Sequence, residues 1–270
     1  MTPEPRASAS SATTTTAGLE IRGAGSGLLD DPLLLNARGA GPDETLLWRA
    51  RLRDDDGRIW QASAPRADEL AAGWVPAKAS TGPLAALGSL RPASIEVRVE
   101  SSDGRAATRT IARLLLAEGV RVRRWRDLAA TLYLPAEPVP TATLLIDATA
   151  GPQQAAVAAL AAPLLASRGV LVLAVAPGRE GAPAAAALPA ARERLAAEPA
   201  AAGAVTELAP RDPFADAVDA AAPAEVPAAA LVLPPGVGAR DAGGPPGAAV
   251  RAAAWDALLV QLGARPRARR

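Results

Sequence analysis

The sequence predicts two domains of different fold class, an all-β sandwich followed by an α/β domain with a parallel sheet. Short β-like segments separated by turn signals fill the chain from Leu19 to about Ala130, as in antiparallel sandwiches. Residues 143–183 instead read as strand, glycine-bearing loop, helix and strand, which is one parallel βαβ unit. A proline-rich stretch lies between the two patterns. We therefore expect one domain over residues 18–130 and a second over residues 131–270.

Composition limits the chemistry that this chain can perform. Half of its 270 residues are apolar, which is enough to bury the cores of two domains. The net charge of +1 gives no global argument for a nucleic acid or a membrane surface as partner. The sequence has no cysteine and no histidine, so it lacks a thiol nucleophile, a thiolate metal site and the usual general base near neutral pH. We expect no cofactor and no bound metal.

The N-terminal residues 1–17 are rich in Ser, Thr and Ala and contain no apolar core segment. This composition predicts a disordered tail and not a signal peptide. No apolar run reaches the ~18 residues that a membrane-spanning helix needs. We therefore expect a cytoplasmic protein without a membrane span. The sequence leaves the oligomeric state open.

The first region contains several strand candidates with turn signals between them. Asp54–Gly57 separates two of them, and Asp-Gly is a strong hairpin signal. Three aspartates in a row also suit a calcium ligand set, but the EF-hand spacing is missing, so a turn is the preferred interpretation. The tryptophans of this region are expected in its core. The strand candidates are Leu33–Leu35, Thr45–Leu52, Ile59–Ala62, Ile95–Val99 and Gly119–Trp125.

Four arginines surround Trp125 near the end of the first region. Two of them, Arg121 and Arg123, alternate with apolar residues at 120, 122 and 125. This alternation favours a solvated face of a strand over a series of phosphate contacts. We expect no nucleic-acid partner.

The second region begins with two apolar strand candidates, Leu144–Ile146 and Val170–Val175. Both are apolar at consecutive positions, as in strands buried on both faces. The helix predicted between them ends at Gly169, which suits a helix C-cap. Prolines at positions 163 and 189 lie inside predicted helices, where each costs ~3 kcal/mol. A further strand at Ala229–Leu233 and an amphipathic helix around Trp255 complete the pattern.

An ordered series of short segments resembles one known family, that of the acyl-CoA thioesterases and bile acid-CoA:amino acid N-acyltransferases. The resemblance implies an immunoglobulin-like β-sandwich followed by an α/β-hydrolase-like domain, shortened here. It covers roughly residues 28–263, with a large gap, and no single motif in it is specific. The segments that carry it are Leu29–Pro32, Trp48–Ala50, Asp56–Trp60, Gly82–Leu84, Leu87–Ser89, Leu132–Pro135, Leu145–Asp147, Leu164–Gly169, Leu173–Ala176, Glu180–Pro183, Gly243-Gly244 and Ala253–Trp255.

The chemistry that this resemblance implies uses a Ser or Cys on a nucleophile elbow, a His that activates it and an Asp that orients the His. No such triad can be assembled from this sequence. Ala239 stands where the His is expected, and Thr206 is the one remote candidate for a nucleophile. Four aspartates compete for the acid position, and a solvated loop is the expected role of each: Asp212, Asp216, Asp219 and Asp241.

Two hypotheses of function follow, and we assign catalytic residues in neither. In the first, the chain is a member of the thioesterase family, for which the resemblance implies hydrolysis of acyl-CoA thioesters, and the missing triad predicts that it is catalytically inactive. In the second, it is a non-catalytic module that binds an acyl group, coenzyme A or another protein. Acyl-CoA is the partner that the resemblance implies. A third hypothesis, that the chain is the product of a degenerate reading frame, also stays open, because the middle of the second region is rich in Ala and Pro.

Overall fold

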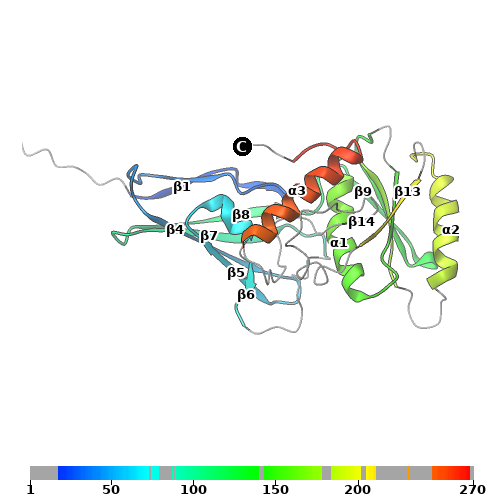
Figure 1. Cartoon of the computed structure of the whole chain (residues 1–270), viewed down its shortest axis with the longest axis horizontal. Helices are drawn as coiled ribbons and strands as arrows, with labels where there is room; N and C mark the ends of the chain where they lie inside the picture. The colour runs from blue at the N-terminus through cyan, green and yellow to red at the C-terminus, as the bar shows by residue number, and fades with distance from the viewer. Residues whose placement is uncertain are drawn as a thin grey trace, which may run out of the picture.

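The computed structural model describes residues 18–72, 74–78, 87, 89–139, 143–177, 184–201, 205–210, 230–231 and 245–267. The tail predicted at residues 1–17 lies outside this part. The described residues form three β-sheets and three α-helices. Figure 1 shows one large sheet at each end of an elongated molecule, with helices α1 (Pro152–Ser167) and α3 (Pro245–Gln261) between them.

The first large sheet has six strands in the order β2-β8-β7-β4-β5-β6. Its neighbouring strands are antiparallel except β2 and β8, which pair in parallel. In β4 the side chains of Trp48 and Leu52 are buried, whereas Arg49, Arg51 and Arg53 are exposed. This alternation leaves one face of the sheet open to solvent. The strands are β2 (Ser26–Leu28), β4 (Leu46–Arg53), β5 (Ile59–Ala64), β6 (Val75–Pro76), β7 (Ala93–Ser101) and β8 (Ala106–Leu114).

The inner face of this sheet is covered by smaller elements. Strands β1 (Glu20–Gly23) and β3 (Leu35–Arg38) form an antiparallel two-stranded sheet, which makes the first half sandwich-like. The 3₁₀ helix η1 (Ala67–Ala72) packs against one end of α3. Ile21 of β1 and Leu70 of η1 are buried in the same cluster as the inward side chains of the six-stranded sheet. All of these elements therefore share one core.

The second large sheet also has six strands, in the order β14-β13-β11-β12-β10-β9. Four of them run in parallel, while β10 is antiparallel to both β12 and β9. Helix α2 (Ala184–Ala196) follows β12 in the chain. The strands are β9 (Arg121–Trp125), β10 (Ala130–Leu134), β11 (Thr143–Asp147), β12 (Leu171–Val175), β13 (Val205–Pro210) and β14 (Ala230–Leu231).

The predicted fold class, an immunoglobulin-like sandwich followed by an α/β-hydrolase-like parallel-sheet domain, is wrong. The first half is sandwich-like, but the second sheet is mixed, and the described chain is mostly β-structure with three α-helices. The strand predicted to close the sandwich, Gly119–Trp125, instead forms β9 and pairs with β10 in the second sheet. The connection between them is a short 3₁₀ helix, Arg126–Leu128, followed by Ala129 at φ 49°. The sequence pattern of a short strand does not specify which sheet the strand joins, so the pairing of β9 with β10 could not be predicted.

The predicted βαβ unit is confirmed. Strands β11 and β12 pair in parallel, from Thr143 opposite Leu171 to Asp147 opposite Val175, and α1 connects them. Gly169 ends the helix with φ +97° and donates its N–H to the carbonyl of Ala166 at 3.0 Å. Helices α1 and α2 both continue through their interior prolines.

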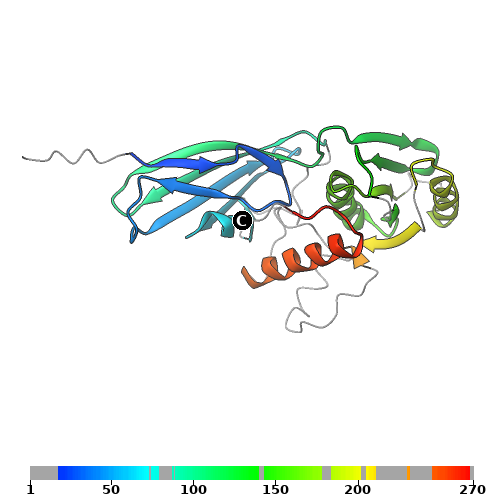
Figure 2. The ribbon, with the colours of Figure 1, turned by 90° about the horizontal axis from the view of Figure 1, so that it is seen from above.

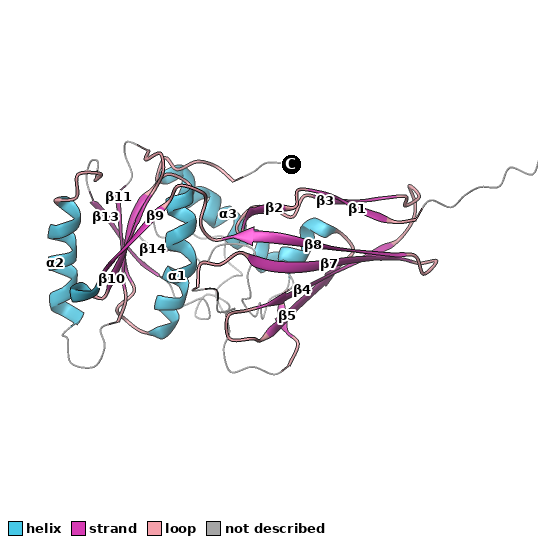
Figure 3. Ribbon diagram, turned by 180° about the vertical axis from the view of Figure 1, so that it is seen from behind, coloured by secondary structure: helices cyan, strands magenta, loops and turns pink. Residues whose placement is uncertain are grey.

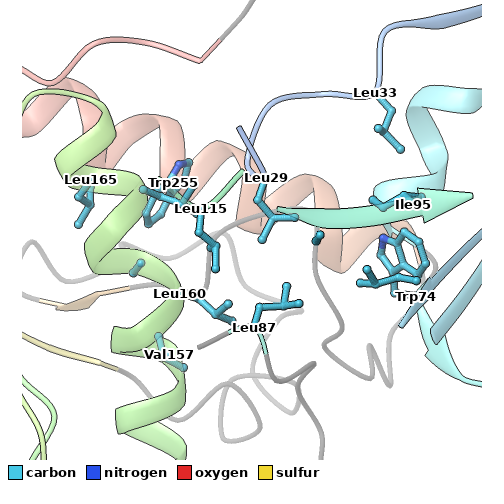
Figure 4. Packing of buried hydrophobic residues seen from close by; sticks show 14 of the residues in the cluster. Leu29, Leu33, Trp74, Leu87, Ile95, Leu115, Val157, Leu160, Leu165 and Trp255 are labelled. Carbon is cyan, nitrogen blue, oxygen red and sulfur yellow. The ribbon is translucent and has the colours of Figure 1, made fainter. Parts of the chain in front are cut away.

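Two hydrophobic clusters lie on opposite faces of the second sheet. The larger cluster joins Leu144 and Ile146 of β11 to α1, α3 and the core of the first half. The smaller cluster contains Leu145, which points to the other face, and residues of α2. Figure 3 shows α1 and α2 on opposite sides of the sheet, and Figure 4 shows Leu160 of α1 facing Leu87 of the first half. The middle of the second sheet, at β11 and β12, is therefore buried on both faces.

A buried ion-pair network joins the two halves. The guanidinium of Arg168, at the end of α1, donates to Asp30 at 2.9 Å and to Asp31 at 2.7 Å. The indole N–H of Trp255 donates to the same Asp30 carboxylate at 2.9 Å. Burial alone would lower the pKa of Arg168, but the Asp30 and Asp31 carboxylates together raise it by more, so the pKa lies above its ordinary value. Arg267 also donates to the Asp30 carbonyl, at 3.0 Å, which fixes the segment after α3 that runs across both halves in Figure 2.

Candidate functional site

The predicted catalytic positions do not form a site in the described residues. Thr206 lies on β13 opposite Leu144 of β11, and its side chain is exposed. Ala239, at the expected His position, lies outside the described residues. The same is true of the four candidate aspartates, Asp212, Asp216, Asp219 and Asp241.

The carboxyl end of β11 carries one acidic side chain, Asp147. Its carboxylate accepts a hydrogen bond from the Thr149 N–H at 3.0 Å and another from the Thr149 hydroxyl at 2.6 Å. These contacts form a local turn before α1. Asp147 therefore shapes the strand-to-helix connection, and among the described residues its side chain bonds to Thr149 and not to Thr206.

The aspartates of Asp54–Gly57 form a hairpin turn between β4 and β5, as preferred in the sequence analysis. The buried Asp54 carboxylate accepts hydrogen bonds from the N–H of Arg58 at 2.8 Å and from the indole of Trp60 at 3.0 Å. Asp55 accepts two more from Ser89, each at 2.8 Å. In the part of the chain that the structure describes, no group of three or more His, Cys, Asp or Glu residues is arranged to hold a metal ion.

A surface cavity lies on the open face of the first sheet, over β4, β5, β6 and β7. Its volume is about 370 Å³, at the small end of the roughly 300–1,000 Å³ typical of ligand pockets. Three arginines, Arg49, Arg51 and Arg98, line it together with Glu96. The remaining lining residues are small or uncharged: Ala50, Gln61, Ala62, Ser63 and Val75. We call this set of residues the arginine face.

Strand register brings these arginines together. Arg49 of β4 lies directly opposite Arg98 of β7, and Arg51 lies opposite Glu96. Like charges directly opposite each other repel, and here Glu100 reduces the repulsion by accepting from Arg49 and from Arg98, each at 2.8 Å. The arginine side chains remain about half exposed, 54% for Arg49 and 51% for Arg98.

Arg51 differs from its two neighbours. Among the described residues, no carboxylate lies within ion-pair distance of its guanidinium, although Glu96 is its cross-strand neighbour. An exposed guanidinium with free donors can bind a carboxylate or phosphate in two-point fashion. Arg51 is therefore the arginine of this face with the most capacity for an external anion.

A second charged cluster holds the β7–β8 turn at one end of the same sheet. Hydrogen bonds from the Ser101 hydroxyl, then from the Arg105 N–H and guanidinium, lower the pKa of Asp103 to about 2. Arg105 also donates to both carboxylate oxygens of Glu44 at 2.8 Å. The Gly41 N–H and these contacts hold the pKa of Glu44 below its ordinary value. Since every member has a partner, this cluster is structural.

The arginine face was missed in the sequence analysis. Its signal is the alternation of arginine with buried residues along β4, at positions 49, 51 and 53, and of charges along β7, at positions 96, 98 and 100. Each pattern alone is typical of a solvated strand face. Arg49 and Arg98 come together because of the register between β4 and β7. This register could not be predicted from the sequence pattern of either strand.

No protein-family model matches this chain, and no curated protein matches it significantly. The resemblance to acyl-CoA thioesterases therefore stays a prediction. Among the described helices, none is both long and apolar enough to cross a membrane.

Proposed function

We propose that this chain is a non-catalytic binding protein for an amphipathic anion of the acyl-CoA class, and that the arginine face is its binding site. The observation that carries the proposal is the convergence of Arg49, Arg51 and Arg98 around a cavity of about 370 Å³. Catalysis is not part of the proposal, because the sequence contains no histidine or cysteine and Thr206 has no base beside it among the described residues.

The charge of the arginine face suits a phosphate group. Each phosphate oxygen accepts hydrogen bonds from guanidinium donors, and two or three arginines around one anion neutralise its charge. An anion bound here would also offset the repulsion between Arg49 and Arg98, which Glu100 reduces in the free protein. Coenzyme A presents phosphates of this kind.

The borders of the arginine face suit an apolar chain. Val75 lines the cavity and is 49% exposed, and Leu47 lies on the same open face of β4, two residues before Arg49, at 38% exposure. Exposed aliphatic side chains beside a charged cavity provide a surface for the acyl part of an amphipathic ligand. We also propose a cytoplasmic location for the protein, as the sequence predicts.

A paired experiment separates binding from catalysis. Purified protein is incubated with acyl-CoAs of several chain lengths, while free thiol is followed and thermal unfolding is recorded with the same ligands. We expect a ligand-dependent rise in Tm and no thiol release above background. Thiol release that disappears in T206A contradicts the non-catalytic part of the proposal. No shift with any acyl-CoA contradicts the ligand class.

A further inference from the structure

Strand β9 forms one edge of the second sheet. It pairs with β10 along its whole length, from Arg121 opposite Leu134 to Trp125 opposite Ala130. On its other side, no strand of the described residues pairs with it. An edge strand presents main-chain N–H and C=O groups that can pair with an added strand. Figure 1 shows β9 in the half of the molecule opposite to β4, which carries the arginine face.

The side chains of β9 are unusual for their charge and exposure. Arg121, Arg123 and Arg124 are all exposed, and Val122 between them is 36% exposed. Arg123 has one distant partner, the Glu198 carboxylate at 3.4 Å. For Arg121 and Arg124, the described residues place no carboxylate within ion-pair distance. The edge therefore combines free positive charge with an exposed aliphatic side chain.

The arginines lie on both faces of the strand. Side chains alternate along a strand, so Arg121 and Arg123 share the face of Trp125, and Arg124 shares the opposite face with Val122. The Trp125 face is the one that packs toward α2, where Arg194 lies over the indole ring, 4.5 Å from its centroid. A strand added beside β9 would meet positive charge above and below the sheet. Two copies of this edge would repel each other, whereas an acidic strand would be attracted.

We propose that β9 is a docking edge for an acidic, extended segment of a partner protein, which adds to the second sheet as a further strand. Main-chain hydrogen bonds would hold the segment, acidic side chains on both faces would pair with Arg121 and Arg124, and an aliphatic residue would cover Val122. A nucleic acid fits this edge less well. Its phosphates offer no pattern of donors and acceptors that matches a strand edge, and the arginines do not converge on one face.

The test uses the full chain and two synthetic peptides, one of repeating Glu-Glu-Val-Val, which carries acidic and aliphatic side chains on both faces of a strand, and one of repeating Gln-Gln-Val-Val. Fluorescence anisotropy measures binding, and amide hydrogen exchange measures protection of residues 121–125. The test variant is R121Q/R124Q, which removes two arginines without breaking a described ion pair. The matched control is R38Q/R53Q, which removes two exposed arginines from β3 and β4.

We expect the Glu peptide alone to bind, to slow exchange of alternate β9 amides, and to lose about fivefold in affinity with R121Q/R124Q, as for two exposed ion pairs. R38Q/R53Q should bind as the natural protein does. The proposal is overturned if the Glu peptide does not bind at low salt, if it binds without protecting β9, or if R121Q/R124Q binds it unchanged. Single-stranded oligonucleotide binding that depends on the same two arginines, with no β9 protection, also overturns it.

Discussion

The two six-stranded sheets of this molecule differ in how many of their faces are buried. In the first sheet, β4 alternates between buried side chains such as Leu52 and exposed arginines, so one face is open. In the second sheet, adjacent residues Leu144 and Leu145 of β11 are both fully buried, on opposite faces. Charged side chains gather across the middle of the first sheet, whereas in the second sheet the exposed charged side chains lie on outer strands such as β9 and β13. The middle of the second sheet therefore belongs to the core, and its surface chemistry is confined to its outer strands.

The largest expected effect comes from the network that joins the two halves. R168A removes the cation that faces the buried Asp30 carboxylate and the partly exposed Asp31 carboxylate. We expect the free energy of unfolding to fall by about 3–5 kcal/mol, because the variant leaves the buried Asp30 carboxylate without its cation. Urea unfolding measures this change.

The control is R22A, which breaks an ion pair with Glu20 whose side chains are 49% and 56% exposed. Exposed pairs contribute ~0–1 kcal/mol, so R22A should change little. An R168A protein as stable as R22A would show that the two halves do not depend on this network.

The next largest effect concerns the buried and open faces of the two sheets. It is measured as the loss of unfolding free energy when one leucine of each sheet is replaced by alanine. L145A removes a side chain that is 0% exposed, between β-strands and α2, and should cost about 2–5 kcal/mol. L47A removes a side chain of the open face that is 38% exposed, and should change the free energy of unfolding by less than ~1 kcal/mol. Equal losses in thermal or urea unfolding would contradict the assignment of one open face to the first sheet.

A smaller effect is the loss of stability of the first sheet at acid pH. The pKa of Asp103 is lowered from 3.8 to about 2, so the folded state holds this carboxylate charged more strongly than the unfolded state does. The resulting stability is present above pH ~4 and is lost as the pH falls toward 2. In D103N this part of the acid dependence should be absent, so the difference in stability between the natural protein and D103N should shrink between pH 5 and pH 2. A constant difference in unfolding experiments across that range would contradict the pKa assignment.

Part of the fold could be predicted because local patterns encode it. The apolar runs at 144–146 and 170–175, with Gly169 between helix and strand, predicted the parallel βαβ unit. Asp54–Gly57 predicted the β4–β5 hairpin. The membership of β9 could not be predicted, because a strand of five residues with exposed arginines has the same pattern in either sheet. Its assignment to the sandwich missed one of the antiparallel pairings, β9 with β10, that make the second sheet mixed.

The candidate site was less predictable than the fold. The family resemblance predicted a nucleophile, a base and an acid in the second region, with Thr206 and Ala239 at two of these positions. The arginine face belongs to the first region and arises from pairing between β4 and β7, which are separated along the chain by β5 and β6. Charge convergence across strands depends on register, and register is set by the whole packed core.

The central claim is that Arg51 binds the anionic part of an acyl-CoA. Isothermal titration calorimetry with one long-chain acyl-CoA tests it on the natural protein, R51Q and the matched control R38Q, since Arg38 is an exposed arginine on β3. We predict that R38Q binds as the natural protein does and that R51Q binds about tenfold more weakly, as expected for one charge-assisted hydrogen bond. All three should keep the same Tm without ligand. Equal affinity of R51Q and R38Q would contradict the claim that the arginine face is the binding site.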